Sequence, residues 1–155
     1  MILPLFAMPV LAASALTAAW SDLRHRRLSN ALVVWTAACG LLLALVGGGM
    51  ATFASALLHG GIALLIGLPL FGWGLFGGGD VKYYAAVAAW LPLEHGFRLL
   101  ACVSLTGAVL ALAWLVGQRL GVVPLAESAG PHRDKLPFGV AIGSGALLTA
   151  LAFSR

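Results

Sequence analysis

The chain has 155 residues, of which 61% are hydrophobic and only 9% are charged, and its formal net charge is +4. Soluble domains are usually about 25% charged, and a single soluble core of this length could not bury so much apolar surface. One membrane-embedded domain covering residues 1–155 is therefore expected, with no room for a separate soluble domain of ordinary size. The basic residues form short clusters between apolar runs and no continuous stripe, so we expect no nucleic-acid partner.

Six apolar stretches predict an all-α, polytopic bundle of about six transmembrane helices. The stretches cover residues 2–20, 30–46, 52–75, 81–93, 97–117 and 136–153. A helix that crosses the hydrocarbon needs about 17–25 residues, so the fourth stretch is short and would reach only about 20 Å. The first stretch is followed by arginines and preceded by no basic residue, which is the reverse of a cleavable secretory signal. We expect it to be a retained first span.

The distribution of basic residues predicts the orientation of the bundle. Two basic residues, Arg98 and Arg155, lie in the loops after the even-numbered stretches or at the C-terminus. The loops after the odd-numbered stretches hold the other seven, namely Arg24, Arg26, Arg27, Lys82, Arg119, Arg133 and Lys135. Basic residues concentrate in cytoplasmic loops. The odd-numbered loops are thus expected in the cytoplasm, with both termini outside and the N-terminal span entering from there.

Acidic residues are rare, and two of the five are candidates for chemistry. Glu94, Glu127 and Asp134 fall in predicted loops, where solvation explains them. Asp22 follows the first stretch and Asp80 precedes the short fourth stretch. Two predicted spans separate these aspartates, so both return to the same side of the membrane and can meet in space.

Paired carboxylates have a well-understood chemistry. Two carboxylates in close contact do not both ionise readily, so they share one proton. The ionised member can activate a water as general base, and the protonated member can polarise an amide carbonyl and later help the amine to leave. Such a pair needs neither a metal nor an organic cofactor. Each aspartate also has an ordinary alternative: Asp22 could be a solvated interfacial residue, and Asp80 a turn residue or helix N-cap after three glycines.

Three ordered motifs in the chain resemble those of the type IV prepilin peptidases, which are intramembrane aspartic peptidases of the GxGD kind. Residues 22–30, DLRHRRLSN, resemble the family's D-x-R-x-R-x-I-P-N stretch. Residues 77–82, GGGDVK, resemble its GxGD motif with a trailing lysine, and residues 135–139, KLPFG, resemble its K-x-P-[FY]-G element. Leu28 and Ser29 stand where the family often has isoleucine and proline, and Ser29 can instead cap the second span.

The resemblance implies a function and a set of site residues. It implies that Asp22 and Asp80 are the catalytic pair, with no metal ligand and no cofactor. The motif residues expected to shape the substrate site are Asn30, Gly77, Gly78, Gly79, Lys82, Pro137, Phe138 and Gly139. The chain looks most like the short CpaA/TadV-like branch, which serves tight-adherence (Flp) pilus systems. That likeness implies a multi-pass protein of the bacterial inner membrane that removes the cationic leader from a prepilin at the cytoplasmic face.

Larger members of the family add a domain with a four-cysteine zinc site and N-methyltransferase activity. This chain has two cysteines, Cys39 and Cys102, without the spacing of a zinc site. Peptidase activity without methylation is therefore expected. Two other functions remain open, a small proton-coupled transporter and an inactive pilus or secretion assembly subunit. The sequence leaves the prepilin and the oligomeric state open.

Three further kinds of polar or aromatic residue have alternative roles. Lys82 could tune the aspartate pair or hold a substrate carbonyl, or it could be a positive-inside anchor. His59 lies towards the outer end of the third stretch, where we expect a hydrogen bond within the bundle. Trp20, Trp73 and Trp90 lie near the ends of stretches and are expected in interfacial aromatic belts.

Overall fold

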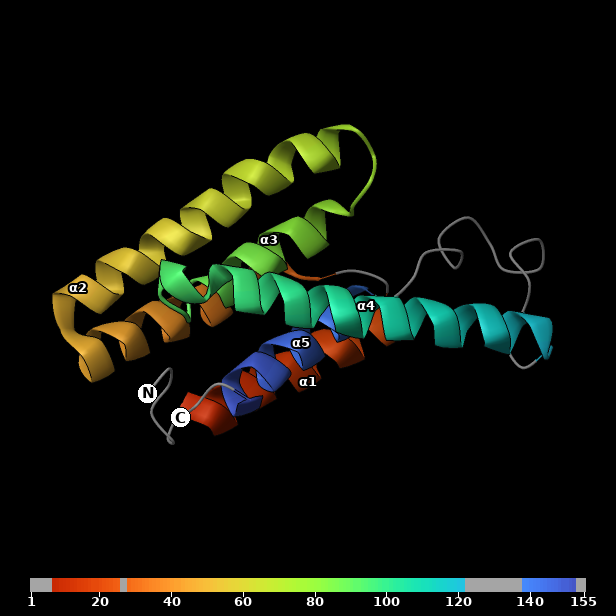
Figure 1. The fold of residues 1–155 in the computed structure, drawn as a ribbon, viewed down its shortest axis with the longest axis horizontal. Coiled ribbons are helices and arrows are strands. Elements are labelled where there is room, and N and C mark those ends of the chain that lie inside the picture. Colours follow the sequence, from red (N-terminus) through yellow and green to blue (C-terminus); the bar gives the residue numbers. More distant parts are fainter. Residues whose placement is uncertain (1–6, 26–27, 122–137, 153–155) are drawn as a thin grey trace.

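The computed structural model describes residues 7–25, 28–121 and 138–152, which contain helices and no β-strand (Figure 1). The elements in chain order are α1 (Ala7–His25), α2 (Asn30–Gly72), α3 (Gly78–Ala88), the short 3-10 helix η1 (Leu93–His95), α4 (Gly96–Arg119) and α5 (Phe138–Ala152). The all-α prediction is confirmed.

Helix α2 joins the second and third predicted stretches into one bent element. It begins after Ser29, whose hydroxyl accepts a hydrogen bond from the Leu32 N–H at 3.2 Å, so the expected capping role is confirmed. At Gly49 the backbone adopts φ +72°, and the helix bends back there into two arms, residues 30–48 and 50–72 (Figure 1). The arms are about 28 Å and about 34 Å long, each close to the hydrocarbon thickness of about 30 Å.

Helix α3 packs between the two arms of α2 because glycines open the space. A Cβ at Gly40, in the first arm, would lie 2.4 Å from Trp90 Cδ1. A Cβ at Gly67, in the second arm, would lie equally close, 2.4 Å, to Val81 Cγ1. Small residues let membrane helices approach closely. The two arms therefore pack against the same short helix and the turn that follows it.

The tryptophans divide between surface and core. Trp20 and Trp73 are 63% and 74% exposed near the ends of α1 and α2, as the interfacial prediction requires. Trp90 is only 1% exposed, and its Nε1–H donates to the Thr36 carbonyl at 2.8 Å. The prediction of an interfacial Trp90 is wrong, because the missing side chain at Gly40 makes a pocket that the indole fills.

A second layer consists of α5 packed between α1 and α4 (Figure 1). A Cβ at Gly143 would lie 3.0 Å from Ala15 Cβ in α1, and one at Gly145 would lie 2.6 Å from Val103 Cα in α4. The Thr106 hydroxyl, in α4, also donates to the Ala141 carbonyl of α5 at 2.8 Å. Between the two layers lies the core, whose largest members include Leu11, Tyr83, Trp90, Leu91, Leu99 and Ile142.

Two helix boundaries differ from the predicted stretches. Helix α1 continues through Asp22 to His25, and α3 covers Gly78–Ala88 where residues 81–93 were predicted. Hydropathy marks where apolar side chains end, whereas a helix continues through polar residues as long as its backbone hydrogen bonds are made. Both aspartates consequently lie inside helices, Asp22 in the last turns of α1 and Asp80 in the first turn of α3.

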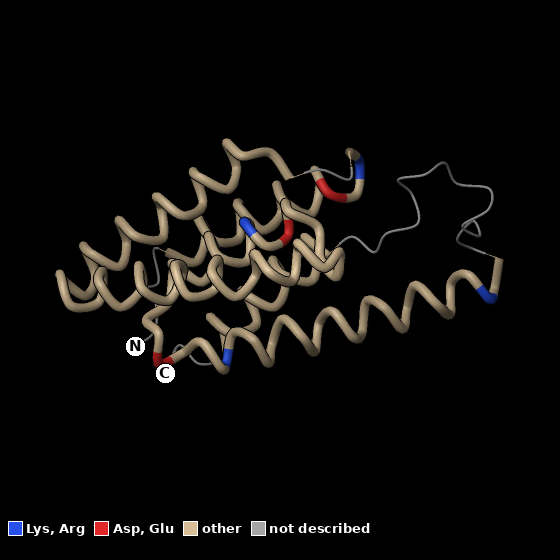
Figure 2. The backbone as a smooth tube through the Cα atoms, turned by 90° about the horizontal axis from the view of Figure 1, so that it is seen from above, with Lys and Arg blue, Asp and Glu red and all other residues tan. Residues whose placement is uncertain are grey.

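The surface of the bundle suits lipid. Two elements, α2 and the run Leu93–Arg119, are long and apolar enough to cross a membrane, and α5 is a shorter apolar helix. Large apolar side chains such as Val46, Leu65 and Leu112 are exposed. The few charged residues of the described chain sit near helix ends, with long uncharged stretches between them (Figure 2). The six-span count and the outside N-terminus remain predictions.

A pair of glycine substitutions tests the packing of α3. Gly40→Ala should lower the free energy of unfolding by about 1–3 kcal/mol, because the methyl collides with Trp90. Gly61→Ala, in the other arm, meets nothing within 4 Å and should leave stability unchanged or raise it by up to about 1 kcal/mol. Thermal unfolding of the purified protein in detergent measures both. Equal stability of the two variants would contradict the packing.

Candidate active site

Asp22 is buried and tied to the start of α5. It is 7% exposed, and its Oδ2 accepts a hydrogen bond from the Gly139 N–H at 2.7 Å. The first N–H groups of a helix have no partner within the helix, so they suit a carboxylate. A Cβ at residue 139 would lie 2.9 Å from that oxygen and 3.2 Å from Asp22 Cβ, so a side chain there would displace the carboxylate. Asp22 is thus not the solvated interfacial residue that was its ordinary alternative.

Asp80 lies in the first turn of α3 and is half-buried. The N-cap position belongs to Gly77, so the alternative of Asp80 as the N-cap is wrong. The carboxylate folds back over the start of the helix, where a Cβ at Gly77 would lie 2.7 Å from Asp80 Oδ2. A negative charge is favourable at this end of a helix. The first glycine of the GxGD motif therefore leaves room for the carboxylate.

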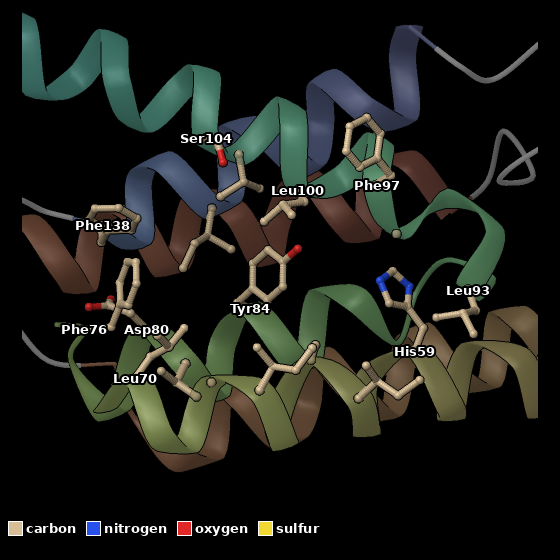
Figure 3. Close-up of a pocket in the computed structure, with 18 residues that line it drawn as sticks. His59, Leu70, Phe76, Asp80, Tyr84, Leu93, Phe97, Leu100, Ser104 and Phe138 are labelled. Atoms are coloured by element: carbon tan, nitrogen blue, oxygen red, sulfur yellow. The ribbon is translucent and has the colours of Figure 1, made fainter. Parts of the chain in front are cut away.

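The segments that carry the two aspartates meet at one corner of the bundle. The rings of Phe76 and Phe138 pack edge to face, with centroids 5.3 Å apart and an interplanar angle of 82°. Phe138 adjoins Gly139, the partner of Asp22, while Phe76, Phe138 and Asp80 line one cavity (Figure 3). We call Asp22, Phe76, Asp80, Phe138 and Gly139 the aspartate corner.

The first two motifs are also in direct contact. Lys82 Nζ donates to Asn30 Oδ1 at 3.3 Å, which links the start of α3 to the start of α2. A Cβ at Gly79 would lie 3.4 Å from Leu28 Cβ, an ordinary van der Waals contact. Lys82 is exposed and does not line the cavity. Its hydrogen bond to Asn30 therefore lies outside the cavity, next to the aspartate corner.

Other motif residues have simpler positions. Gly78 faces the ring of Phe71, to which a Cβ would come within 3.1 Å. Pro137, the remaining predicted site residue, lies outside the described residues, as do Lys135 and the arginines 26 and 27. Within the described ranges, no three His, Cys, Asp or Glu side chains gather closely enough to hold a metal ion.

A cavity of about 520 Å³ begins at the corner and extends along the bundle. Its walls come from the second arm of α2 and from α3, α4 and α5, and its lining is mostly apolar. Figure 3 shows Asp80 at one end, beside Phe76 and Phe138, and His59 at the other, with Tyr84 between them. A peptide in this cavity would reach Asp80 directly, whereas Asp22 is not among the lining residues and is bound by the Gly139 N–H of α5.

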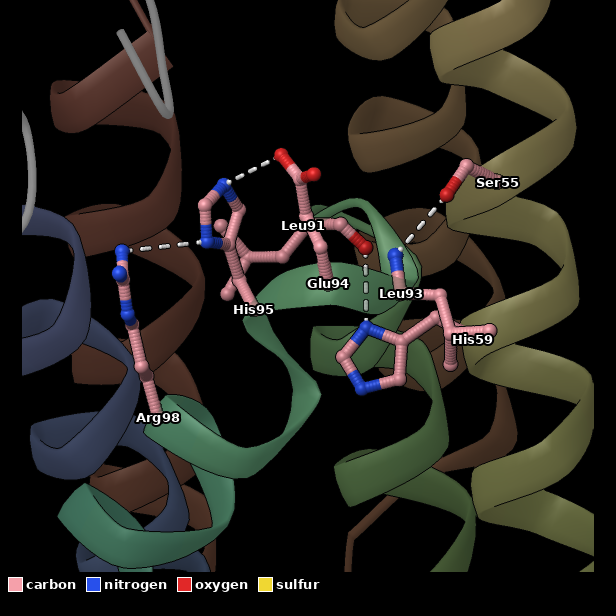
Figure 4. Close-up of polar contacts among 7 residues, drawn as sticks. All are labelled: Ser55, His59, Leu91, Leu93, Glu94, His95 and Arg98. Atoms are coloured by element: carbon pink, nitrogen blue, oxygen red, sulfur yellow. Dashed lines mark hydrogen bonds and ion pairs between the residues drawn. The ribbon is translucent and has the colours of Figure 1, made fainter.

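Sequence reasoning named three cavity residues, Asp80, Phe138 and His59, and missed the rest of the lining. Tyr84 follows Asp80 by four positions, which places both on one face of α3, and that spacing was an available signal. Ser104 and Phe97 lie in an apolar run and carried no signal. The bundle hydrogen bond expected of His59 is confirmed, since its Nδ1 lies 2.9 Å from the Leu91 carbonyl oxygen (Figure 4).

Two substitutions at Asp22 test its contact with α5. Asp22→Ala should lower the free energy of unfolding by about 1.5–3 kcal/mol, because the Gly139 N–H loses a charged acceptor. Asp22→Asn keeps a carbonyl oxygen in the same place and should cost less, about 1 kcal/mol or below. Thermal unfolding in detergent measures the difference. A loss that is no larger for Ala than for Asn would contradict the hydrogen bond.

Comparison with known proteins agrees with the motifs. Residues 9–112 match the model of the type IV leader peptidase family, and this segment carries both Asp22 and the Gly77–Asp80 motif. No curated protein and no solved structure matches the chain. The family match covers more than half of the sequence. The described part of the chain is helical, and two of its helices are long and apolar enough to cross a membrane. This membrane protein belongs to the type IV leader peptidase family.

Proposed function

We propose that the protein is an aspartic endopeptidase that removes the leader from a type IV, Flp-type prepilin at the cytoplasmic face of the bacterial inner membrane, without N-methylating the product. One observation carries the proposal. The start of α5 contacts both aspartate-bearing segments: the Gly139 N–H donates to Asp22, and Phe138 packs against Phe76 and lines the same cavity as Asp80. Membership of the leader peptidase family supports the peptidase function.

The geometry suits a carboxylate pair acting on an amide. Asp80 faces the cavity, and Asp22 is fixed by the Gly139 N–H. The ionised member of the pair takes a proton from water as the water oxygen attacks the amide carbon, and the protonated member donates to the carbonyl oxygen. When the C–N bond breaks, the leaving nitrogen takes a proton back from the pair. No step needs a cofactor.

The position of the corner suits a substrate whose cationic leader precedes an apolar helix. Asp22 and Asp80 lie near helix ends, where the exposed cations Arg24 and Lys82 are typical of the cytoplasmic side and are not what would attract a cationic leader. The apolar cavity continues from Asp80 in the other direction. A cleaved bond at Asp80 would leave the leader on the aqueous side and the apolar segment within the bundle.

Leader cleavage tests the pair. The full chain is co-expressed in membranes with a Flp-type prepilin, and cleavage is followed by gel mobility. Asp22→Asn and Asp80→Asn should each slow cleavage at least about 100-fold, because each removes one half of the acid–base pair. Glu94→Gln, at an exposed acid in η1, is the matched control and should cleave like wild type.

The outcomes separate the candidate functions. Cleavage by either aspartate variant at the wild-type rate would contradict the dyad. If wild type cleaves none of several Flp-type prepilins, the transporter and assembly-subunit functions replace the peptidase function as the better explanation. Insertion of each variant is checked by membrane fractionation.

The two glycines that face the carboxylates give a second test. Gly139→Ala and Gly77→Ala should each slow cleavage about 10- to 100-fold, since the added methyl displaces a carboxylate by a fraction of an ångström or more. Ser144→Ala, on the exposed face of α5, removes a hydroxyl that bonds only to carbonyls of its own helix and should have no effect. Wild-type rates in both glycine variants would show that carboxylate position does not limit cleavage.

A further inference from the structure

We infer that the cavity docks the apolar helix that follows the cleaved bond of the substrate, and that His59 accepts a hydrogen bond from a polar side chain of that helix. His59 is then a specificity-determining residue, distant from the reacting atoms. The inference rests on the proposed function, because it takes the cleaved bond to lie at Asp80.

The contacts of His59 fix the role of each ring nitrogen. Nδ1 lies 2.9 Å from the Leu91 carbonyl oxygen, which can only accept, so Nδ1 carries the hydrogen (Figure 4). In the neutral ring Nε2 is then an acceptor. His59 is 4% exposed, and within the described residues no group donates a hydrogen bond to Nε2.

The acceptor faces the cavity. Figure 3 shows the imidazole turned into the cavity at the end remote from Asp80, near Leu93 and Phe97. A Cβ at Gly96 would lie 3.0 Å from Nε2, so the missing side chain at the start of α4 leaves this nitrogen open. Because Nε2 opens onto the cavity, a donor on the occupant can reach it, whereas an apolar occupant would leave it without a hydrogen bond.

The polar groups of the cavity favour a polypeptide over a lipid tail. The hydroxyls of Tyr84 and Ser104 also line the cavity, and neither has a hydrogen-bond partner within the described residues. An acyl chain would leave all three groups unsatisfied, whereas a helix can present side-chain donors and acceptors among apolar residues. The cavity is also continuous with Asp80, so a peptide cleaved there extends along it.

Helix geometry predicts which residue of the substrate helix reaches His59. The second arm of α2 runs antiparallel to α3, because Gly67 faces Val81 while Gly60 faces Ala89. His59 therefore lies about 14 Å along the bundle from the level of Asp80. A helix that starts at the cleaved bond brings its residue at about position ten to this depth. A Ser, Thr, Asn, Gln or Trp side chain there would donate to Nε2.

Photo-cross-linking tests the docking without requiring cleavage. In the full-length Asp22→Asn variant, p-benzoylphenylalanine replaces either Leu100, which lines the cavity, or Leu112, which is exposed elsewhere on α4. With a co-expressed Flp-type prepilin in membranes, position 100 should form an adduct of protein plus prepilin, and position 112 should form none. An adduct with a second copy of the chain, equal adducts from both positions, or no protein adduct from position 100 would overturn the docking.

Cleavage kinetics test the role of His59. A serine is moved through positions 6 to 14 after the cleaved bond of an otherwise apolar prepilin helix. Wild type should show a KM roughly three- to tenfold lower when the serine is near position ten, with kcat unchanged. His59→Asn keeps a donor for the Leu91 carbonyl but lacks a group at Nε2, and it should lose this preference. Ser55→Ala removes the neighbouring hydrogen bond from the Leu93 N–H at a residue that does not itself line the cavity, and it should keep the preference (Figure 4).

Three results would overturn the role of His59. These are no position preference in wild type, a preference retained by His59→Asn, or a preference lost equally in Ser55→Ala. Failure of the peptidase mechanism itself gives a different signature, since Asp22→Asn and Asp80→Asn would then cleave normally whatever the serine position.

Discussion

The hydrogen bond from the Gly139 amide to Asp22 is the contact on which the arrangement of the bundle depends. A buried carboxylate is costly unless it is hydrogen-bonded, and the free N–H groups at the start of α5 supply the donor. The bond joins residues 117 positions apart and fixes α5 against α1. Because Phe138 precedes Gly139, the same contact brings an aromatic ring against Phe76 and thereby to the segment that leads to Asp80.

The packing and the cavity follow from where small residues stand. Gly67 brings the second arm of α2 onto α3, and Gly40 brings the first arm onto Trp90 in the turn after α3. Gly143 and Gly145 bring α5 onto α1 and α4. These contacts bury the helix faces that carry small residues. The second arm of α2 and α4 then face each other across the remaining space, which larger apolar side chains line. The bundle is therefore tightly packed around α3 and α5 and open on the side where Asp80 lies.

Local features could be predicted from the sequence, whereas contacts between distant segments could not. Hydropathy located the helices, since apolar runs of sufficient length have to be helical in lipid, and the cap by Ser29 follows from side-chain chemistry. The continuation of α1 through Asp22 was missed because hydropathy reports lipid exposure and not backbone hydrogen bonding. The burial of Trp90 against Gly40 and the cavity lined by Tyr84 depend on how helices cross, which no local pattern encodes. The motifs indicated which residues to examine, but not that a backbone amide of α5 holds Asp22.

Cysteine cross-linking tests most directly whether the two aspartates share one site. With Cys39 and Cys102 replaced by alanine, Asp22→Cys and Asp80→Cys are combined in one chain and treated with a short bifunctional thiol reagent. The pair Leu28→Cys and Gly79→Cys is the positive control, because a Cβ at residue 79 would lie 3.4 Å from Leu28 Cβ, close to disulfide geometry. Asp22→Cys with Glu94→Cys is the negative control. We expect intramolecular cross-linking of the 22–80 pair comparable to the 28–79 pair and none for 22–94. Cross-linking of 28–79 without any of 22–80 would contradict a shared carboxylate site.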